Sequence, residues 1–127
     1  MKILLIEDDL DDIEFLQEAF KNQGVEVDMD IANDGSAAVN HIRTARQYPD
    51  IIILDLNLPK IHGREVILEI KSSPAFQLVP LLILTTSSAR EDMEYAYRHG
   101  ADKYVIKPTT LEQIRQTVNT ILSLLQK

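Results

Sequence analysis

Residues 51–59 read IIILDLNLP. The four apolar residues Ile51 to Leu54 predict a short β-strand that is buried on both faces. Asp55 follows this strand directly, and a carboxylate in that position is costly, because burying an unpaired charge raises the free energy of the folded state. The stretch therefore indicates a buried strand that leads into a site where Asp55 has a partner.

The first apolar segment of the chain is also followed directly by acidic residues. Lys2 to Ile6 predicts another buried strand, and Glu7 and Asp8 follow it directly. In an open α/β sheet, binding sites form beyond the carboxyl ends of the parallel strands. The two acidic strand ends are therefore expected to meet at one edge of a single sheet.

Strand and helix patterns alternate five times along the chain. The predicted strands cover residues 2–6, 25–31, 50–55, 81–85 and 103–106. Each is followed by a segment in which apolar residues recur at helical spacing. This alternation predicts an α/β fold with a five-stranded parallel sheet and helices on both of its faces. The second strand alternates apolar and acidic residues, which is typical of an edge strand.

Composition argues against several classes of protein. The chain has 127 residues, and we expect residues 1–127 to form a single domain with no separate output domain. A net charge of −7, from 13 basic and 20 acidic residues, argues against nucleic-acid binding, which needs clustered Lys and Arg. No apolar run is long enough to span a membrane, and no cysteine is present for a disulfide or a thiolate metal site. These features suit a cytoplasmic protein without membrane association.

The remaining strand ends add a hydroxyl and an amine to the three acids. Thr85 ends one strand and Lys107 follows another. Converging carboxylates repel one another unless a cation lies between them, and ligands that are all oxygens favour Mg²⁺. Mg²⁺ sites commonly bridge a phosphate, so we expect phosphoryl chemistry in which Asp55 is the nucleophile and forms an acyl phosphate. Lys107 and Thr85 would then contact phosphoryl oxygens.

Each of these residues also has a simpler role when it is taken alone. Asp55 could cap a turn, Thr85 could be an ordinary strand residue, and Lys107 could be a solvated loop residue. Their joint position at strand ends favours the chemical interpretation. The chain has no Gly-rich phosphate loop and no GxGxxG after the first strand, which argues against a nucleoside triphosphatase or a dinucleotide enzyme.

Four short segments together resemble the receiver domain of two-component response regulators. They are LLIEDD at 4–9, DLNLP at 55–59, LTT at 84–86 and YVIKP at 104–108. The resemblance covers the whole chain and implies a (βα)5 flavodoxin-like fold with strand order 2-1-3-4-5. It also implies a phosphoprotein that receives its phosphoryl group from a partner histidine kinase. Such a protein is not an enzyme on other substrates and promotes only its own phosphorylation and slow autodephosphorylation.

The resemblance assigns a role to each acidic strand end. Asp55 is implied to be the phosphoacceptor. Glu7, Asp8 and Asp55 are implied to hold Mg²⁺, together with the backbone carbonyl of Asn57.

The same resemblance implies a switch. Thr85 would move with Lys107 toward the new phosphoryl group, and the space that Thr85 leaves would let Tyr104 turn inward. The surface formed by the fourth helix, the fifth strand and the fifth helix would then change its contacts. A homodimer, the kinase and a downstream phosphotransfer protein are the partners implied. The Lys107–Pro108 peptide bond is implied to be cis.

Two longer segments resemble one subgroup more closely. DLNLPKIHGREV at 55–66 and LTTSSAREDMEYAY at 84–97 are similar to small regulators that partner bacterial phytochrome kinases. His62 departs from the family, which often has Asp before this glycine. We expect His62 to alter the loop or the kinase contact and to leave phosphorylation intact. On the fourth helix, Tyr95 and Tyr97 would lie on opposite sides, so one of them should be exposed.

Two other functions compete with the phosphorylation switch. A receiver-like interaction module that works without phosphorylation would be expected to lack part of the acidic set, and this chain has all of it. A phosphatase with an aspartyl nucleophile usually needs a further acid two residues after the nucleophile. The chain has Asn57 at that position, which argues against catalytic turnover.

Overall fold

The computed structural model describes residues 1–125, so the last two residues of the predicted domain lie outside the described part. One parallel sheet contains β1 (Lys2–Ile6), β2 (Asp28–Ala32), β3 (Ile51–Leu54), β4 (Leu81–Thr85) and β5 (Lys103–Ile106). The helices are α1 (Leu10–Asn22), α2 (Gly35–Thr44), α3 (Gly63–Ser72), the 3₁₀ turn η1 (Phe76–Leu78), α4 (Arg90–Arg98) and α5 (Leu111–Leu125). The strand order β2-β1-β3-β4-β5 confirms the predicted α/β fold and its order. None of the described helices is both long and apolar enough to cross a bilayer.

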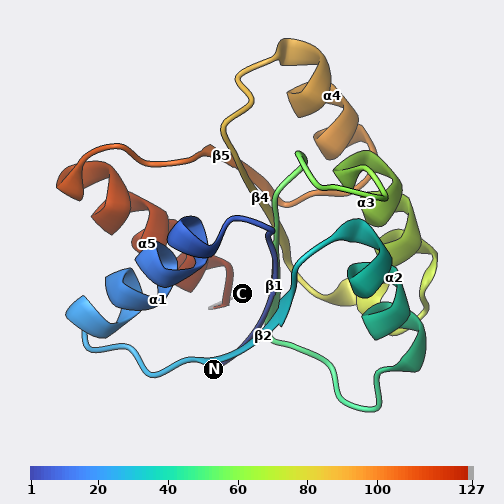
Figure 1. The fold of residues 1–127 in the computed structure, drawn as a ribbon, viewed down its shortest axis with the longest axis horizontal. Helices are drawn as coiled ribbons and strands as arrows, with labels where there is room; N and C mark the ends of the chain where they lie inside the picture. The colour runs from blue at the N-terminus through green and yellow to red at the C-terminus, as the bar shows by residue number, and fades with distance from the viewer. Residues whose placement is uncertain (126–127) are drawn as a thin grey trace.

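The sheet lies between two layers of helices (Figure 1). Helices α1 and α5 cover one face, and α2, α3 and α4 lie on the other. The side chains of β3 alternate between two cores: Ile52 and Leu54 pack under α2, α3 and α4, whereas Ile51 and Ile53 pack under α1 and α5. All four are fully buried, and each such burial stabilises the fold by about 1.5–3 kcal/mol. This explains why the sequence of β3 is apolar at every position.

Strand β2 is an edge strand, as predicted, but it begins three residues later than expected. Its first residue, Asp28, pairs with Lys2, the first residue of β1. Residues 25–27 therefore extend past the start of β1 and have no strand beside them. The alternating pattern of this segment reflects half-burial against α1 and α5 rather than membership of the sheet.

Every peptide bond among the described residues is trans, Lys107–Pro108 included. The prediction of a cis bond at this position is therefore wrong. The trans isomer is the intrinsically favoured one even before proline, by about 0.5–1 kcal/mol. The backbone N–H of Lys107 donates to the carbonyl of Thr85 at 2.8 Å, which continues the pairing of β4 with β5 up to the proline.

The loop from β3 to α3 is held close to its own strand. The N–H of Gly63 donates to the carbonyl of Leu56 at 3.1 Å, and a Cβ at Gly63 would lie 2.5 Å from the Cα of Leu56. A side chain at this position would therefore collide with backbone. His62, directly before this glycine, is the N-cap of α3, because its Nδ1 accepts from the backbone N–H of Arg64 at 3.0 Å. The imidazole nitrogen thus accepts the hydrogen bond that a side-chain oxygen of aspartate would accept at an N-cap.

Replacing His62 should therefore affect the start of α3. We expect His62→Ala to lower the free energy of unfolding by about 1 kcal/mol, the usual loss for an N-cap, and His62→Asp to retain the stability of the parent protein. Urea denaturation of the three proteins at pH 8 measures both effects. An equal loss in both variants would mean that the imidazole stabilises the loop by packing and not by capping.

Candidate functional site

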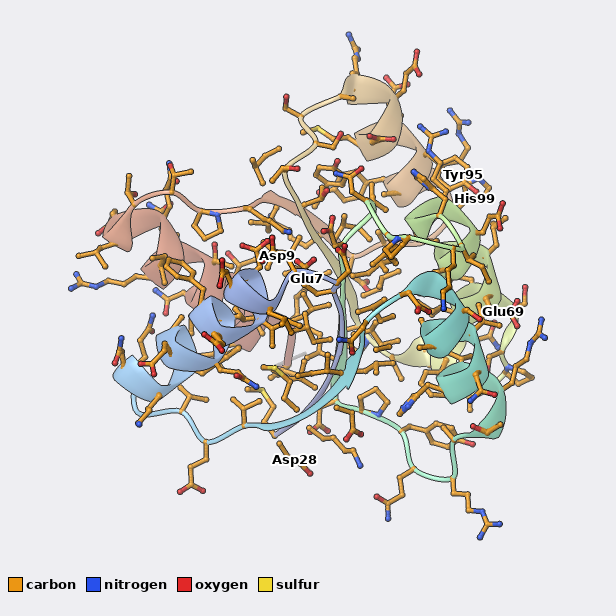
Figure 2. The ribbon with its side chains drawn as sticks, in the orientation of Figure 1. Glu7, Asp9, Asp28, Glu69, Tyr95 and His99 are labelled. Atoms are coloured by element: carbon orange, nitrogen blue, oxygen red, sulfur yellow. The ribbon has the colours of Figure 1, made fainter. Side chains whose placement is uncertain are left out.

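Three carboxylates meet at the carboxyl ends of β1 and β3. Glu7, Asp8 and Asp55 each place an oxygen within 4.8 Å of the others. The N–H of Asp55 donates to the carbonyl of Ile6 at 3.0 Å, so the pairing of the two strands continues up to the acids. Figure 2 shows Glu7 beside the start of α1, at the end of the sheet opposite Asp28. The prediction that both acidic strand ends share one edge is confirmed.

Lys107 joins this cluster from the end of β5. Its Nζ lies 2.6 Å from Oε1 of Glu7, 2.6 Å from Oδ2 of Asp12 and 3.0 Å from Oδ2 of Asp55. The Lys107 side chain is only 14% exposed. The sequence predicted that Lys107 would reach Asp55, but the contact with Asp12 was not predicted.

Each buried carboxylate uses one oxygen for Lys107 and the other for backbone N–H groups. Oδ1 of Asp55 accepts from the N–H of Asn57 at 3.1 Å. Oε2 of Glu7 accepts from the N–H of Asp8 at 3.1 Å. Glu7 and Asp55 are each 4% exposed, so these hydrogen bonds replace most of the hydration that the carboxylates lose.

The shared environment separates the pKa values of the two buried acids. Burial, together with the neighbouring Asp55, raises the pKa of Glu7 from its ordinary 4.5 to about 7, and Lys107 opposes this shift. Burial would also raise the pKa of Asp55, but hydrogen bonds from the Asn57 N–H, Glu7 and Lys107 outweigh it, and the pKa is lowered. For Lys107, hydrogen bonds to the three acids outweigh burial and raise the pKa. At neutral pH, Asp55 is therefore ionised, and Glu7 holds a proton for part of the time.

The acids suit a hard divalent cation. Two buried carboxylates and the exposed Asp8 offer oxygen ligands within one ionic site, and oxygen ligands favour Mg²⁺ or Mn²⁺. The raised pKa of Glu7 reflects burial and repulsion from Asp55, which a bound cation would relieve. The residues present therefore fit a metal. The role of the Asn57 carbonyl as a further ligand stays a prediction.

Metal binding at these acids should depend on pH. Because the pKa of Glu7 is raised to about 7, Mg²⁺ must displace a proton below that pH, whereas Glu7 is already ionised above it. We expect the apparent affinity to weaken by up to about tenfold for each pH unit below 7 and to level off above pH 8. Isothermal titration calorimetry between pH 5.5 and 8.5 measures this. An affinity that stayed constant down to pH 5.5 would contradict the raised pKa.

Two predicted switch residues meet at the segment after β4. Thr85 is fully buried, and its hydroxyl oxygen accepts from the N–H of Ser87 at 3.4 Å. Tyr104 is 9% exposed, and its hydroxyl donates to the carbonyl of Ser87 at 2.9 Å. The ring of Tyr104 therefore already lies inward while Thr85 stays at the end of β4, which differs from the expectation that Tyr104 turns inward only after Thr85 moves. Ser87 connects the two side chains. This link through Ser87 was not predicted from the sequence.

Ser87 also connects this segment with α3 and α4. Its hydroxyl donates to Asp92 at 2.5 Å, and the guanidinium of Arg64 donates to Asp92 at 2.7 Å. The same guanidinium lies 4.8 Å from the centroid of the Tyr95 ring. No spacing in the sequence could reveal this network, because Arg64 and Asp92 are 28 residues apart.

The prediction for the two tyrosines of α4 is confirmed. Tyr97 is 48% exposed, while Tyr95 packs against the core and against His99, with ring centroids 4.3 Å apart. Figure 2 shows Tyr95 and His99 side by side on this helix. The hydroxyl of Tyr97 accepts from the N–H of Tyr104 at 3.0 Å. Tyr97 therefore combines an exposed ring with a contact to the backbone of β5.

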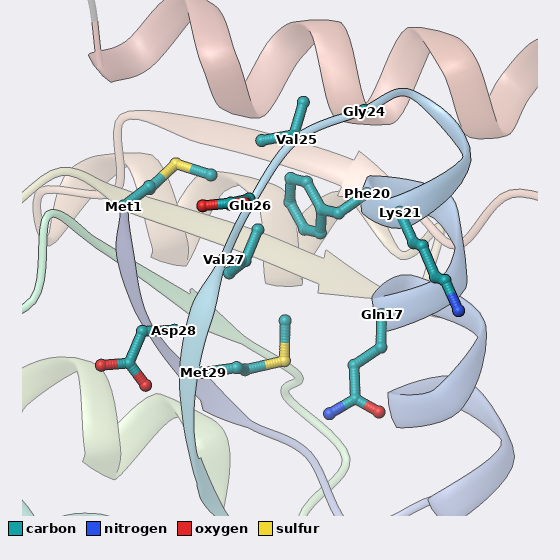
Figure 3. A pocket seen from close by; sticks show the side chains of 10 residues that line it. All are labelled: Met1, Gln17, Phe20, Lys21, Gly24, Val25, Glu26, Val27, Asp28 and Met29. Atoms are coloured by element: carbon teal, nitrogen blue, oxygen red, sulfur yellow. The ribbon is translucent and has the colours of Figure 1, made fainter.

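A groove of about 820 Å³ lies far from the acids (Figure 3). It is enclosed by the end of α1 and the segment that leads into β2, and its lining includes Met1, Phe20, Val27 and Met29. Met1 precedes β1, whereas Glu7 follows it, so the groove and the acidic site lie at opposite ends of the same strand. The groove is therefore not part of the acidic site.

Comparison with known proteins gives a consistent result. Residues 3–119 match the response regulator receiver domain family. FilR2 of Methanothrix harundinacea, a probable methanogenesis regulatory protein, is 35% identical over 94% of this chain and 79% of its own length. The response regulator Rcp1 of Synechocystis is 36% identical over 95% of this chain and 86% of its own length.

Solved structures of similar proteins share the fold closely. The phosphorylated cyanobacterial phytochrome response regulator RcpA has a TM-score of 0.87 and 37% identity, covering 99% of this chain and 94% of that one. The Mn²⁺-bound form of Rcp1 has a TM-score of 0.84 and 35% identity, covering 96% of this chain and 91% of that one. Two proteins that share this fold were thus solved in a phosphorylated form and in a Mn²⁺-bound form.

Proposed function

The chain belongs to the response regulator receiver domain family of two-component signalling, and from this we propose that Asp55 accepts a phosphoryl group from a partner histidine kinase. One observation carries the proposal. Asp55 is a buried, ionised carboxylate that has the ammonium of Lys107 at 3.0 Å and two further acids within 4.8 Å. Such a cluster concentrates charge where phosphoryl transfer needs it.

Different residues of the pocket would have different roles in the phosphoryl transfer. A carboxylate oxygen of Asp55 forms a new O–P bond as the N–P bond of the kinase phosphohistidine breaks, and the electron pair returns to the imidazole nitrogen. The N–H of Asn57 orients the carboxylate through Oδ1. Lys107 lies at Oδ2, where its charge would meet the phosphoryl oxygens. Apart from the nucleophile Asp55, the pocket would thus act through positioning and charge neutralisation.

We assign Mg²⁺ to Glu7, Asp8 and Asp55, with the backbone carbonyl of Asn57 as a fourth protein ligand. When bound, the cation supplies charge neutralisation between the carboxylates and the incoming phosphoryl group. The clustering of the three carboxylates and the Mn²⁺-bound form of the similar protein Rcp1 support this assignment. Mn²⁺ and Mg²⁺ favour the same oxygen ligands.

The signal would leave the pocket through the segment after β4. Thr85 and Lys107 would turn to the phosphoryl group, which would change how Thr85 holds the N–H of Ser87. Ser87 in turn contacts both Tyr104 and Asp92, so a shift there would bias the surface of α4, β5 and α5. The exposed ring of Tyr97 lies on this surface.

The partner kinase would be a bacterial phytochrome. The similarity to Rcp1 and to the phytochrome response regulator RcpA supports this choice, while the comparable similarity to FilR2 makes another kinase the alternative to test. The α4, β5 and α5 surface would serve a homodimer or a downstream phosphotransfer protein.

Incubation with acetyl phosphate and Mg²⁺ tests this function. We expect a phosphorylated species on a phosphate-affinity gel and a Mg²⁺-dependent change in elution volume on size-exclusion chromatography. Omission of Mg²⁺, or its removal with a chelator, should abolish both. A folded protein that binds no Mg²⁺ and gains no phosphoryl group would instead be a receiver-like interaction module.

A further inference from the structure

A third carboxylate contacts Lys107 without belonging to the metal cluster. Oδ2 of Asp12, in the first turn of α1, lies 2.6 Å from Nζ of Lys107. We propose that Asp12 is a positioning residue that occupies the lysine hydrogen which a phosphoryl oxygen would take, and so limits how tightly the pocket holds a phosphoryl group. This inference rests on the proposed phosphorylation of Asp55.

The lysine has no hydrogen to spare. An ammonium group has three N–H donors, and three carboxylates, those of Glu7, Asp12 and Asp55, lie 2.6–3.0 Å from Nζ of Lys107. Two of these contacts, with Asp12 and Asp55, are hydrogen bonds, and that with Glu7 is an ion pair. A phosphoryl oxygen can therefore contact Lys107 only if one of the three acids gives up its place beside the ammonium group.

Asp12 is the acid that is easiest to release. Its side chain is 41% exposed, whereas those of Glu7 and Asp55 are 5% exposed. Water can replace the lysine at an exposed carboxylate at little cost in free energy, but a buried carboxylate that loses its partner stays unsatisfied. Glu7 and Asp55 are also tied to backbone N–H groups.

The position of Asp12 is fixed by the start of its helix. Asp9 caps α1, and its side chain accepts from the N–H of Asp11 at 2.9 Å and of Asp12 at 3.1 Å. The first turn therefore holds Asp12 at the mouth of the pocket, from which its carboxylate reaches Lys107. Asp11 belongs to the same turn and carries the same charge, but its side chain is exposed and makes no contact with Lys107.

This arrangement has a measurable consequence. If Asp12 competes for the lysine, removing its charge should strengthen the binding of a phosphoryl mimic. The gain should be roughly threefold to fivefold, the size of a partly exposed ion pair. Binding of Mg²⁺ alone should change little, because Asp12 is not among the acids that cluster around the metal position.

The test uses beryllofluoride, a non-covalent mimic of a phosphoryl group, with saturating Mg²⁺. The affinities of the parent protein, Asp12→Asn and Asp11→Asn are compared by titration. We expect tighter beryllofluoride binding only in Asp12→Asn, and an affinity for Mg²⁺ alone within about twofold in all three proteins. In a Lys107→Met background, Asp12→Asn should have no effect, which a purely structural role of Asp12 would not explain.

Other results would overturn the inference. Weaker binding in Asp12→Asn would show that Asp12 anchors Lys107 for the phosphoryl group instead of competing with it. Equal effects in Asp12→Asn and Asp11→Asn would show that only the overall charge matters. If the parent protein binds Mg²⁺ but not beryllofluoride, the proposed phosphorylation itself fails, and that result is distinct from either of the others.

Discussion

Asp55→Asn should reduce Mg²⁺-dependent phosphorylation to the level of the buffer control. The amide has no negative charge and is a poor nucleophile toward phosphorus, and no other carboxylate shares the position of Asp55 between Asn57 and Lys107. Asp55 is buried, and the hydrogen bonds to its carboxylate lower its pKa. Labelling with radioactive acetyl phosphate in the presence of Mg²⁺ measures the loss.

Asp50→Asn provides the matched control for this result. Asp50 directly precedes β3, at the end opposite Asp55, and its substitution removes the same charge. This variant should be labelled as fast as the parent protein. Circular dichroism should show the same fold in both variants. Labelling of Asp55→Asn at the parent rate would assign the phosphoryl group to another residue.

Lys107→Ala should produce the largest loss of stability among the pocket variants. Without the lysine, Glu7 and Asp55 remain buried beside each other with no countercharge, and an unpaired buried charge usually costs about 3–5 kcal/mol. At pH 8 without Mg²⁺, we expect a loss of about 3 kcal/mol in the free energy of unfolding. This is the lower end of the range, because Asp8 is exposed and water can reach part of the cluster there. Urea denaturation measures it.

Mg²⁺ and acid should each reverse part of this loss. A cation takes over the neutralisation, and a lower pH protonates the carboxylates, whose pKa values should be higher once Lys107 is gone. The variant should therefore be closer to the parent protein at pH 5 than at pH 8. In the parent, the raised pKa of Lys107 means that its stabilisation is complete below its ordinary value of 10.5 and is lost only as the pH rises through the folded value.

Lys103→Ala serves as the control for this second prediction. Lys103 is the exposed first residue of β5, on the same strand that leads to Lys107. Its loss should change the stability by less than about 0.5 kcal/mol. A similarly small effect of Lys107→Ala at pH 8 would mean that the acids are solvated enough to need no lysine.

The central part of the fold could be predicted from the sequence because burial on both faces leaves a plain signal. The apolar runs at 2–6 and 81–85 gave strands with the observed bounds. The start of β2 could not be predicted, because it is set by where β1 begins, and Val25 and Val27 are apolar for another reason, their contact with α1 and α5. The turn η1 was also missed, since its buried Phe76 lies in a segment too short to show a period.

Some contacts of the candidate site could also be predicted from the sequence, and others could not. Acids at strand ends could be predicted to converge, because the topology of a parallel sheet fixes where its carboxyl ends lie. The contacts of Asp12 with Lys107 and of Arg64 with Asp92 could not, because they join helices and loops whose packing has no fixed spacing in the sequence. The cis bond before Pro108 was implied by resemblance alone, and the structure has it trans.

The burial of the strands implies a gradient of local stability across the sheet. β3 and β4 are buried at every residue, and β1 at all but its first, whereas β2 and β5 contain exposed positions. Opening of a backbone segment costs more where more apolar contacts must break. Asp55 and Glu7 thus extend from the strands whose amides should exchange slowest with solvent, while Tyr104 belongs to an edge that opens more readily. Under the proposed function, the phosphoryl group would thus be received on the most stable strands, and the switch residue Tyr104 would lie on a less stable edge strand.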